Sequence, residues 1–344
     1  MRHLQAPICA PDNLHAAYAA ARKGKRYTPE ALDFAGQAET SLIRLREELL
    51  SERWQSGPPR QFNIYEPKWR QIVAPPFPDR IVHHAIVRVI EPFFERRFIH
   101  DSYACRVNKG THAAVQRTQR FLRIAKRRWG GCYVVKADVA KYFASIRHDV
   151  AIDALARTLD DHWLFRLFER VLSGYGFDAG VGIPVGALTS QLIANVVLDQ
   201  LDHRVKDEWG ERFFVRYMDD IVLIVRDKAD ARWRLHDLGE ALGDLKLKLN
   251  PKSTYFPYQR GVDFCGYCIW PTHILPRKHT MKRWRRRLSR IAASARRHRG
   301  IQGDPAAYPT ALADMRAAVK SCTAYTRHCS AHRTLTAILG DCAL

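Results

Sequence analysis

The sequence predicts an α+β fold, and two observations support this prediction. Both ends of the chain have the apolar spacing that is typical of helices, whereas the strand-like runs lie between them. Two of these runs, at residues 132–138 (CYVVKAD) and 213–225 (FFVRYMDDIVLIV), are rich in the β-branched and aromatic residues that buried strands favour. With 344 residues, of which 47% are hydrophobic, the chain is long enough to form roughly two or three packed units.

The charge of the chain is strongly unbalanced. Lys and Arg number 56 and Asp and Glu number 35, so the formal net charge is +21. A surplus of this size indicates a polyanionic partner, with nucleic acid as the first candidate and an anionic membrane surface as the second. The sequence contains no run of about 18 uncharged apolar residues and no secretion signal at its N-terminus, so we expect neither a transmembrane helix nor export.

Apolar spacing and chain breaks place the elements of the first half. The Gly57-Pro58-Pro59 run should end the N-terminal helical region, because these residues interrupt regular structure. Pro92 should break or kink a helix around it, since proline lacks the N–H that a helix interior needs. Helices are expected at residues 14–22, 30–52, 80–98, 111–128 and 148–172, and strands at residues 61–72 and 132–138.

The second half begins with a glycine-rich segment. Residues 174–186 contain five glycines and are expected to form a loop. The GxGxxA spacing that starts at Gly174 matches a dinucleotide-binding fingerprint only superficially, because it follows a helix-like segment rather than a strand. Thr189 or Ser190 should cap the next helix. Helices are expected at residues 189–209, 228–245, 276–299 and 305–344, a β-hairpin at 213–225, and strands at 247–256 and 263–270.

Two cysteines have the spacing of half a zinc site. Cys265 and Cys268 form a CxxC pair, but they lie in an apolar run, and the next pair, Cys322 and Cys329, is spaced too widely for a standard zinc knuckle. Structural thiols in a reducing compartment are the favoured interpretation, with metal binding as the alternative.

Three aspartates carry the chemistry that the sequence suggests. The hairpin at 213–225 presents Asp219 and Asp220 at its turn, and Asp138 ends the buried strand at 132–138. Aspartate is common in turns, so a solvated pair is the plainer interpretation of the hairpin taken alone. Three aspartates that converge from neighbouring strands would instead form an oxygen-rich site suited to Mg²⁺. Two such ions about 3.5–4 Å apart would serve nucleotidyl transfer to a polyanionic substrate.

These residues resemble the palm of reverse transcriptases. The YMDD segment at 217–220 lies between apolar strands, and Asp138 precedes it in KADVAKYFASI. Further segments agree with that family in order and spacing over residues 61–270: PKWRQIVAPPFPDRIVHHAI and SYACRVNKGTHAAV with its fingers, GIPVGALTSQLIANVVLDQLD with its nucleotide-facing loop and helix, LNPKST with the next palm segment, and FCGY with its primer grip. The resemblance implies a right-hand polymerase with a helical N-terminal extension at 1–60, fingers at 61–136, a palm at 137–270 with interleaved fingers segments, and a short basic helical thumb at 271–344.

One detail distinguishes subfamilies. Group II intron enzymes usually carry Gln-Gly and Ser-Pro in the nucleotide-facing loop, whereas this chain has Val185-Gly186 and Ser190-Gln191. That form resembles the reverse transcriptases of diversity-generating retroelements. The resemblance implies cDNA synthesis from a template RNA with errors at adenines, and a small basic oligomeric accessory variability protein as partner. It also implies a cytoplasmic location in a bacterial host cell, with a phage as an alternative source of the gene. A group II intron-like or retron enzyme is the alternative within the class, and a catalytically silent RNA-binding scaffold is the alternative outside it.

The resemblance also implies roles for individual residues. Asp138, Asp219 and Asp220, with the backbone carbonyl of Val139, would hold two Mg²⁺ ions, for which Mn²⁺ could substitute. Phe143 would be the steric gate that favours dNTP over NTP, although an aromatic ring there could also serve core packing.

Further residues would contact the incoming nucleotide. Arg70 and Lys68 would bind its triphosphate, because a guanidinium suits phosphate oxygens. Lys252 would protonate pyrophosphate, with a solvated turn as the plainer interpretation. Val185 replaces a glutamine that can form a hydrogen bond near the nascent pair, and the absence of that hydrogen bond should cost about 1–3 kcal/mol of discrimination. The plainer interpretation is that Val185 only packs and that fidelity is set elsewhere. Gly186 and Gln191 would line the same site.

The most basic stretch of the chain follows the FCGY segment. Residues 264–303 contain eleven Lys or Arg and no Asp or Glu. A helix there with Trp284 on its apolar face could lie on a membrane surface, but as a thumb it would lie along the template–primer duplex with Trp284 in the core. The expected nucleic-acid contacts are Arg106, Lys109, Tyr217, Met218, Gly266, Tyr267, Lys282, Arg283, Arg285 and Arg286.

Overall fold

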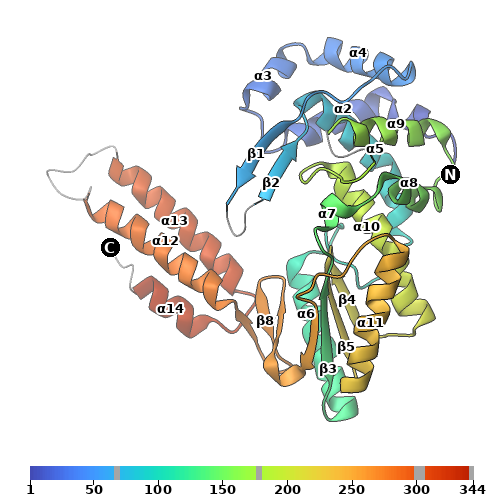
Figure 1. Ribbon diagram of the computed structural model, residues 1–344. Coiled ribbons are helices and arrows are strands. Elements are labelled where there is room, and N and C mark those ends of the chain that lie inside the picture. Colours follow the sequence, from blue (N-terminus) through green and yellow to red (C-terminus); the bar gives the residue numbers. More distant parts are fainter. Residues whose placement is uncertain (66–69, 176–179, 298–306, 341–344) are drawn as a thin grey trace. The chain divides into compact units, whose positions relative to one another are not determined.

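The computed structural model describes residues 1–65, 70–175, 180–297 and 307–340. It contains helices and antiparallel sheets, as the predicted α+β class requires (Figure 1). The chain forms two compact units, each built from several segments. The first unit comprises Met1–Asn108, Ala137–Ile221 and Arg234–Ser253, and the second comprises Lys109–Lys136, Val222–Trp233 and Thr254–Leu344.

The N-terminal part of the first unit is helical. Helices α1 (Gln5–Ile8), α2 (Pro11–Arg22), α3 (Pro29–Gly36) and α4 (Ala38–Leu50) are followed by the antiparallel hairpin β1 (Arg60–Ile64) and β2 (Arg70–Ala74). The single helix expected at 30–52 was therefore wrong, because Gln37 has extended φ and ends α3 before α4 begins. The single strand expected at 61–72 is the hairpin, whose connecting residues 66–69 lie outside the described part.

Helix α5 (Phe77–Glu95) is continuous through Pro92, so of the predicted break or kink the break does not occur. Pro92 stands near the C-terminal end, where a missing N–H removes one helix hydrogen bond and few residues follow. The helix also buries a long apolar face that includes Ile81, Ile86 and Ile90, which are all 0% exposed. Burial of that face against α2 and α10 offsets the cost of the proline.

The middle of the chain follows the prediction in type but differs in boundaries. Helix α6 (Thr111–Trp129) and strand β3 (Tyr133–Asp138) form where expected. The region 148–172 contains two helices rather than one, and a short helix precedes them. The elements are α7 (Tyr142–Ser145), α8 (His148–Ala156), α9 (His162–Ser173), α10 (Leu188–His203) and the π-helical turn η1 (Arg204–Glu208).

The predicted cap of α10 was wrong. Ala187 is the N-cap residue and provides no side-chain hydrogen bond, whereas Thr189 and Ser190 lie inside the helix and are buried. Gly176 and Ala179 of the GxGxxA spacing lie outside the described residues.

The predicted hairpin is confirmed and belongs to a four-stranded sheet. Strands β4 (Phe214–Tyr217) and β5 (Asp220–Val225) neighbour each other, and the sheet order is β4-β5-β3-β6, with β6 at Thr254–Pro257. Strand β3 pairs with β6 in antiparallel register, Val134 opposite Phe256. Helix α11 (Lys228–Asp244) follows β5. The carboxylates at the hairpin turn and at the end of β3 thus belong to one sheet.

In the second unit, the strand expected at 263–270 is split into two. Strands β7 (Val262–Phe264) and β8 (Tyr267–Ile269) pair as an antiparallel hairpin, and β9 (Ile274–Pro276) pairs with β8. Cys265 and Gly266 form the turn, both with positive φ (50° and 91°), and glycine adopts that conformation without strain. The sequence prediction missed this turn because the residues around Gly266 are apolar and read as one continuous strand.

Three helices complete the second unit: α12 (Lys278–Arg297), α13 (Ala307–Thr326) and α14 (His332–Gly340) (Figure 1). They share one apolar core that includes Leu288 and Ala292 of α12, Cys322 of α13 and Ile338 of α14. Trp284 packs against this core, as its helical spacing predicts.

Candidate active site

A backbone hydrogen bond joins the segment that contains Asp138 to the segment that contains Asp219 and Asp220. The N–H of Val139, directly after Asp138, donates to the carbonyl oxygen of Asp219 at 3.3 Å. Asp138 closes β3, Asp219 lies between β4 and β5, and Asp220 is the first residue of β5, which neighbours β3 in the sheet. This arrangement explains the proximity. Asp138, Asp219 and Asp220 are all half-buried, while Val139 is buried. The three predicted aspartates therefore lie in one region of the first unit.

Asp138 is held by a segment from which sequence reasoning singled out only Lys252. Asn250 Nδ2 donates to Asp138 Oδ2 at 2.8 Å, and the N–H of Asn250 donates to the Asp138 carbonyl at 2.8 Å. Ser253 Oγ accepts from the N–H of Asp138 at 3.1 Å. Lys252 itself is exposed, and its N–H donates to Asn250 Oδ1 at 3.0 Å. The local contact from Lys252 to Asn250 is one that an asparagine in a turn often forms, but no signal in the sequence indicated the contact from Asn250 to Asp138.

A buried ion pair lies beneath the turn between β4 and β5. Arg216 and Asp202 are both 0% exposed, and two parallel contacts join them, Nε to Oδ1 at 2.7 Å and the terminal NH2 nitrogen to Oδ2 at 2.6 Å. Burial acts to lower the pKa of Arg216, but the neighbouring Asp202 carboxylate outweighs it and raises that pKa above its usual value. The Arg216 guanidinium therefore remains charged inside the protein.

The same guanidinium connects the turn to helix α10. The remaining terminal nitrogen of Arg216 donates to the Met218 carbonyl and to Asn195 Oδ1, each at 3.1 Å. Met218 has φ of 57°, a left-handed conformation that a non-glycine residue adopts at a cost. Asn195 and Asp202 both belong to α10. The strained residue before Asp219 is thus fixed by a buried charge network.

The predicted nucleotide-facing loop is attached to β2. The N–H of Val73 donates to the Val185 carbonyl at 3.4 Å, and Gly186 has φ of 122°. A Cβ at Gly186 would lie 3.4 Å from Ile72 Cγ2. Phe143, in α7, is partly exposed, and its carbonyl accepts from the N–H of Ile183 at 2.8 Å.

A pocket of about 510 Å³ lies beside this loop. Gly186 and Gln191 line it together with apolar side chains of the β1–β2 hairpin such as Phe62 and Ile72. Lys25 and Arg80 also line it. The pKa of Lys25 is lowered, first by the positive charge of the neighbouring Arg80 and second by burial. Positive charge in excess of local carboxylate makes this pocket suited to an anionic ligand.

The remaining predicted nucleotide contacts are less well defined. Lys68 lies outside the described residues. Arg70 is the first residue of β2, opposite Ile64, and its side chain is likewise outside the described part. Neither triphosphate contact is therefore tested by the geometry.

Arg106 has a structural position. Its side chain is 5% exposed, and it donates to both oxygens of Glu95 and to the carbonyls of Ile99 and Ser102, at 2.7 to 3.1 Å. A guanidinium bonded in this way stabilises the loop after α5, and this geometry gives no support to a direct nucleic-acid contact. Lys109 lies two residues before α6 and is half-buried.

The predicted primer-grip residues are anchored within the second unit. Tyr267 is 0% exposed, its hydroxyl donates to the Tyr325 carbonyl at 2.9 Å, and the two rings stack with centroids 4.8 Å apart. Tyr325 in turn donates to the Gly266 carbonyl at 2.5 Å, and His112 Nε2 lies 3.1 Å from the Tyr267 hydroxyl. Through its contacts with Tyr325, which bonds Gly266, Tyr267 helps to fix the β7–β8 turn.

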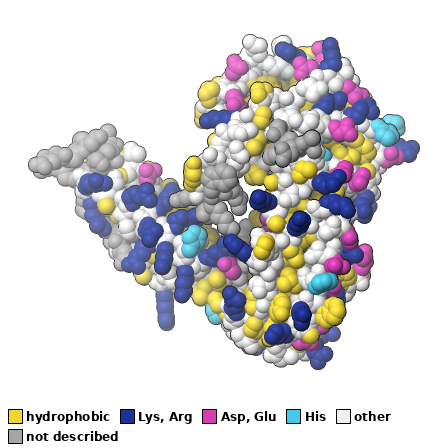
Figure 2. Space-filling view, viewed as in Figure 1, with side chains coloured by type: hydrophobic (Ala, Val, Ile, Leu, Met, Phe, Trp, Pro, Cys, Tyr) yellow, Lys and Arg dark blue, Asp and Glu magenta, His cyan; other side chains and the backbone are white. Residues whose placement is uncertain are grey.

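The cations of α12 face away from its apolar core. Lys282, Arg283, Arg285 and Arg286 are all exposed, and Figure 2 shows Lys and Arg gathered over the region of α12. No helix in the described ranges is long and apolar enough to cross a membrane. The helix presents a cationic face of the kind that binds a polyanion.

The comparisons with known proteins agree with this geometry. Residues 61–269 match the model of the family described as reverse transcriptase (RNA-dependent DNA polymerase). This chain belongs to the reverse transcriptase family. The matched region contains Asp138, Asp219, Asp220 and the β7–β8 turn.

Relatives of this reverse transcriptase include a bacterial protein named YkfC and a group II intron-encoded protein. Protein YkfC of Escherichia coli is 29% identical over 267 residues, which cover 65% of this chain and 69% of YkfC. Group II intron-encoded protein LtrA of Lactococcus lactis is 26% identical over 48% of this chain but only 28% of LtrA. A structure of Candida albicans telomerase with a telomeric RNA fragment aligns with a TM-score of 0.48 at 10% identity, over 88% of this chain and 58% of that one.

The donor set of this reverse transcriptase suits a hard divalent cation in its chemistry. The candidate ligands are three carboxylates and the Val139 carbonyl, which are all oxygen donors. Within the ranges that the structure describes, no three His, Cys, Asp or Glu side chains converge closely enough to hold one ion. The backbone contact between Val139 and Asp219 brings the donors into one region, and side-chain rotation would have to complete the ligand set.

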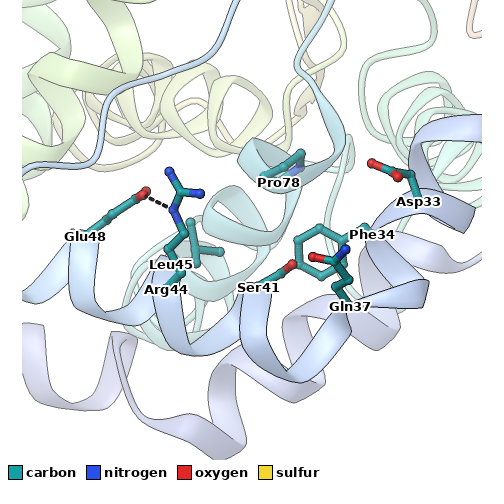
Figure 3. Close-up of a pocket in the computed structure, with 8 residues that line it drawn as sticks. All are labelled: Asp33, Phe34, Gln37, Ser41, Arg44, Leu45, Glu48 and Pro78. Carbon is teal, nitrogen blue, oxygen red and sulfur yellow. Dashed lines mark hydrogen bonds and ion pairs between the residues drawn. The ribbon is translucent and has the colours of Figure 1, made fainter.

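A second pocket, of about 350 Å³, lies away from these residues (Figure 3). It is lined by side chains of α3, α4 and the start of α5, such as Phe34 and Leu45, and by Gln37 between α3 and α4. Arg44 and Glu48 form an ion pair at its edge, with Nε to Oε1 at 2.9 Å. It contains none of the predicted site residues.

Disrupting the buried ion pair should separate stability from activity. Asp202→Ala leaves the Arg216 charge buried and unpaired, and we expect the free energy of unfolding to fall by about 3–5 kcal/mol. The double variant Arg216→Met/Asp202→Leu removes both charges and should regain much of that stability. It should still be impaired in primer extension, because the Met218 carbonyl loses its donor. Urea denaturation and primer extension measure the two effects, and full activity of the double variant would contradict the role given to Arg216.

Removing cations from α12 should weaken duplex binding and its dependence on salt. Lys282→Gln/Arg286→Gln removes two exposed charges one helical turn apart, and the slope of log affinity against log salt should flatten by up to about 0.9 for each phosphate that the variant no longer neutralises. Lys228→Gln/Arg232→Gln on α11 is a matched control with the same spacing and exposure. Fluorescence anisotropy with an RNA–DNA duplex measures the slopes. Equal slopes in both double variants would argue against a duplex contact at α12.

Proposed function

We propose that this reverse transcriptase makes cDNA on a template RNA by two-metal-ion nucleotidyl transfer at Asp138, Asp219 and Asp220. The observation that carries the proposal is the hydrogen bond from Val139 to Asp219, because it joins the two stretches of chain that supply every proposed metal ligand. Mg²⁺ is the proposed ion and Mn²⁺ a substitute. When bound, the ions would lower the pKa of the primer hydroxyl and neutralise the leaving pyrophosphate.

The residues of the chain would orient these donors and the substrates. Asn250 donates a hydrogen bond to one carboxylate oxygen of Asp138 and thereby orients the carboxylate. The second oxygen would then be available to a metal ion. Arg216 fixes the backbone before Asp219. Phe143 would exclude the 2′-OH of an NTP, and Arg70 with Lys68 would bind the triphosphate of the dNTP. Lys252, exposed in the adjoining turn, would supply a proton to pyrophosphate.

We further propose that copying is error-prone, with a role in a diversity-generating retroelement. Val185 lies in the nucleotide-facing loop, half-buried and held through its backbone by Val73. Its side chain has bulk but no hydrogen-bonding group, so it offers no polar check on the nascent base pair. Errors at adenines, a structured template RNA and a small basic accessory protein belong to this proposal.

A group II intron-like role is the second candidate. It is favoured by the intron-encoded relatives, such as LtrA and a putative intron protein of Saccharomyces cerevisiae that is 26% identical over 52% of this chain. It shares the active site of the first proposal and differs in fidelity and biological setting.

Asp219→Asn tests the proposed chemistry. We expect primer extension on an RNA template to fall below about one per cent of wild type, because the substitution removes a charged metal ligand. Affinity for the template–primer duplex should be retained, since the fold is unchanged. Asp153→Asn, an exposed aspartate of α8, is the control and should remain active. An inactive wild-type protein that still binds RNA would favour a silent scaffold instead.

Val185→Gln tests the proposed infidelity. Restoring a hydrogen-bonding group should raise fidelity by roughly ten- to a hundredfold, since one such contact supplies about 1–3 kcal/mol of discrimination. Val185→Ile keeps the bulk without the group and should keep the error rate. Sequencing cDNA made by the purified variants measures both. An adenine error rate that is unchanged in Val185→Gln would refute the role of Val185, and a low error rate in wild type would favour the intron-like candidate.

A further inference from the structure

A chain of buried polar side chains joins helix α5 to the first turn of α10. His83 of α5 is 1% exposed. Its Nδ1 lies 2.7 Å from the hydroxyl of Thr189, and its Nε2 lies 2.6 Å from the hydroxyl of Tyr175. Thr189 is the second residue of α10 and is 0% exposed, and Tyr175 follows α9 and is also buried. All three residues belong to the first unit.

The chemistry of His83 requires both of its contacts, the one to Thr189 and the one to Tyr175. Burial lowers the pKa of His83 to about 3, so the imidazole is neutral at any working pH. A neutral imidazole has one donor and one acceptor nitrogen, and so one hydroxyl must donate to it while the other accepts. Removing either hydroxyl would leave a buried ring nitrogen unpaired, which is more costly than losing an exposed hydrogen bond.

The far end of the chain returns to α5. Ser56 Oγ donates to Asp79 Oδ2 at 2.6 Å, and Asp79 lies one helical turn before His83. Gly174, the residue before Tyr175, lies close to Ser56, because a Cβ on Gly174 would lie 2.2 Å from Ser56 Cβ. The Ser56 side chain also forms a hydrogen bond with Tyr175. Tyr175 therefore contacts both Ser56 and His83.

The other end acts on the nucleotide-facing segment. Helix α10 begins at Leu188, and no side chain caps its N-terminus. The contact between His83 and Thr189 therefore connects the first turn of α10 to helix α5. Gln191 lies two residues beyond Thr189, and Gly186 three residues before it. His83, Gly186 and Gln191 line the same pocket of about 510 Å³. The position of that pocket wall therefore depends on a contact to α5.

We propose that His83, together with Thr189 and Tyr175, positions the first turn of α10 and thereby sets the affinity of the enzyme for the incoming dNTP. The inference rests on the proposed function, in which Val185, Gly186 and Gln191 face the nucleotide. His83 does not touch the reacting atoms in this scheme. It is a positioning residue, and its loss should affect nucleotide binding more than the chemical step.

The test uses variants that delete single hydroxyl groups. Thr189→Val keeps the volume and removes the partner of His83 Nδ1, and we expect KM for dNTP to rise about five- to tenfold while kcat stays within about twofold. Thr189→Ser retains a hydroxyl and should restore KM to near the wild-type value. Tyr175→Phe breaks the other contact of His83, keeps the ring, and carries the same expectation as Thr189→Val.

The control and the contradicting results are equally specific. Thr118→Val deletes a buried hydroxyl in α6 that donates to the Ala114 carbonyl of its own helix at 2.8 Å, and it should leave KM for dNTP unchanged. Primer extension with the whole chain, duplex affinity by fluorescence anisotropy, and thermal unfolding are measured for each variant. An unchanged KM in either folded variant, or an equal rise in Thr118→Val, would overturn the proposal. Failure of the proposed function is distinguishable, because wild type itself would then not extend the primer.

Discussion

The buried ion pair between Arg216 and Asp202 is the constraint on which the candidate site depends. Charges with 0% exposure are expensive to remove from water, and they persist only where geometry and further hydrogen bonds compensate. Arg216 meets that condition by bonding Asp202, Asn195 and the Met218 carbonyl. The contact to the Met218 carbonyl also holds Met218 in a left-handed conformation and so positions Asp219, the next residue. Arg216 therefore affects both the stability of the protein and the position of the Asp219 carboxylate.

Helix α10 gives this constraint a longer reach. Its later turns supply Asp202 and Asn195 to the carboxylate turn, while its first turn is tied through Thr189 to His83 of α5. The helix therefore links the proposed metal-binding end of the site to the proposed nucleotide-facing loop. Asp138 is fixed independently, by Asn250 and Ser253. Donors that are oriented before substrate binds need little reorganisation during the reaction, which is how such sites stabilise developing charge.

Local signals predicted much of the fold, and their failures have local causes. The β-branched run ending at Asp138 and the apolar spacing around Trp284 are strong patterns, and both elements formed as expected. Pro92 does not end α5, because it stands near a helix end and an extensive buried face offsets its cost. The turn at Cys265 and Gly266 was missed because its flanking residues continue the apolar run. Thr189 matched a capping residue in type, but its hydroxyl bonds a histidine from another helix instead.

The sequence by itself determined the α+β class, the basic surplus, the family resemblance and the placement of three aspartates at strand ends and turns. These properties depend on composition, periodicity and residue order, which are local. Only the tertiary structure decided that Asn250 bonds Asp138, that Arg216 pairs with Asp202, and that His83 pairs with Thr189. His83 and Thr189 are 106 positions apart and Asn250 and Asp138 are 112 apart. Exposed and buried cations also look alike in sequence, because only packing distinguishes Arg106, bonded on all sides, from the exposed cations of α12.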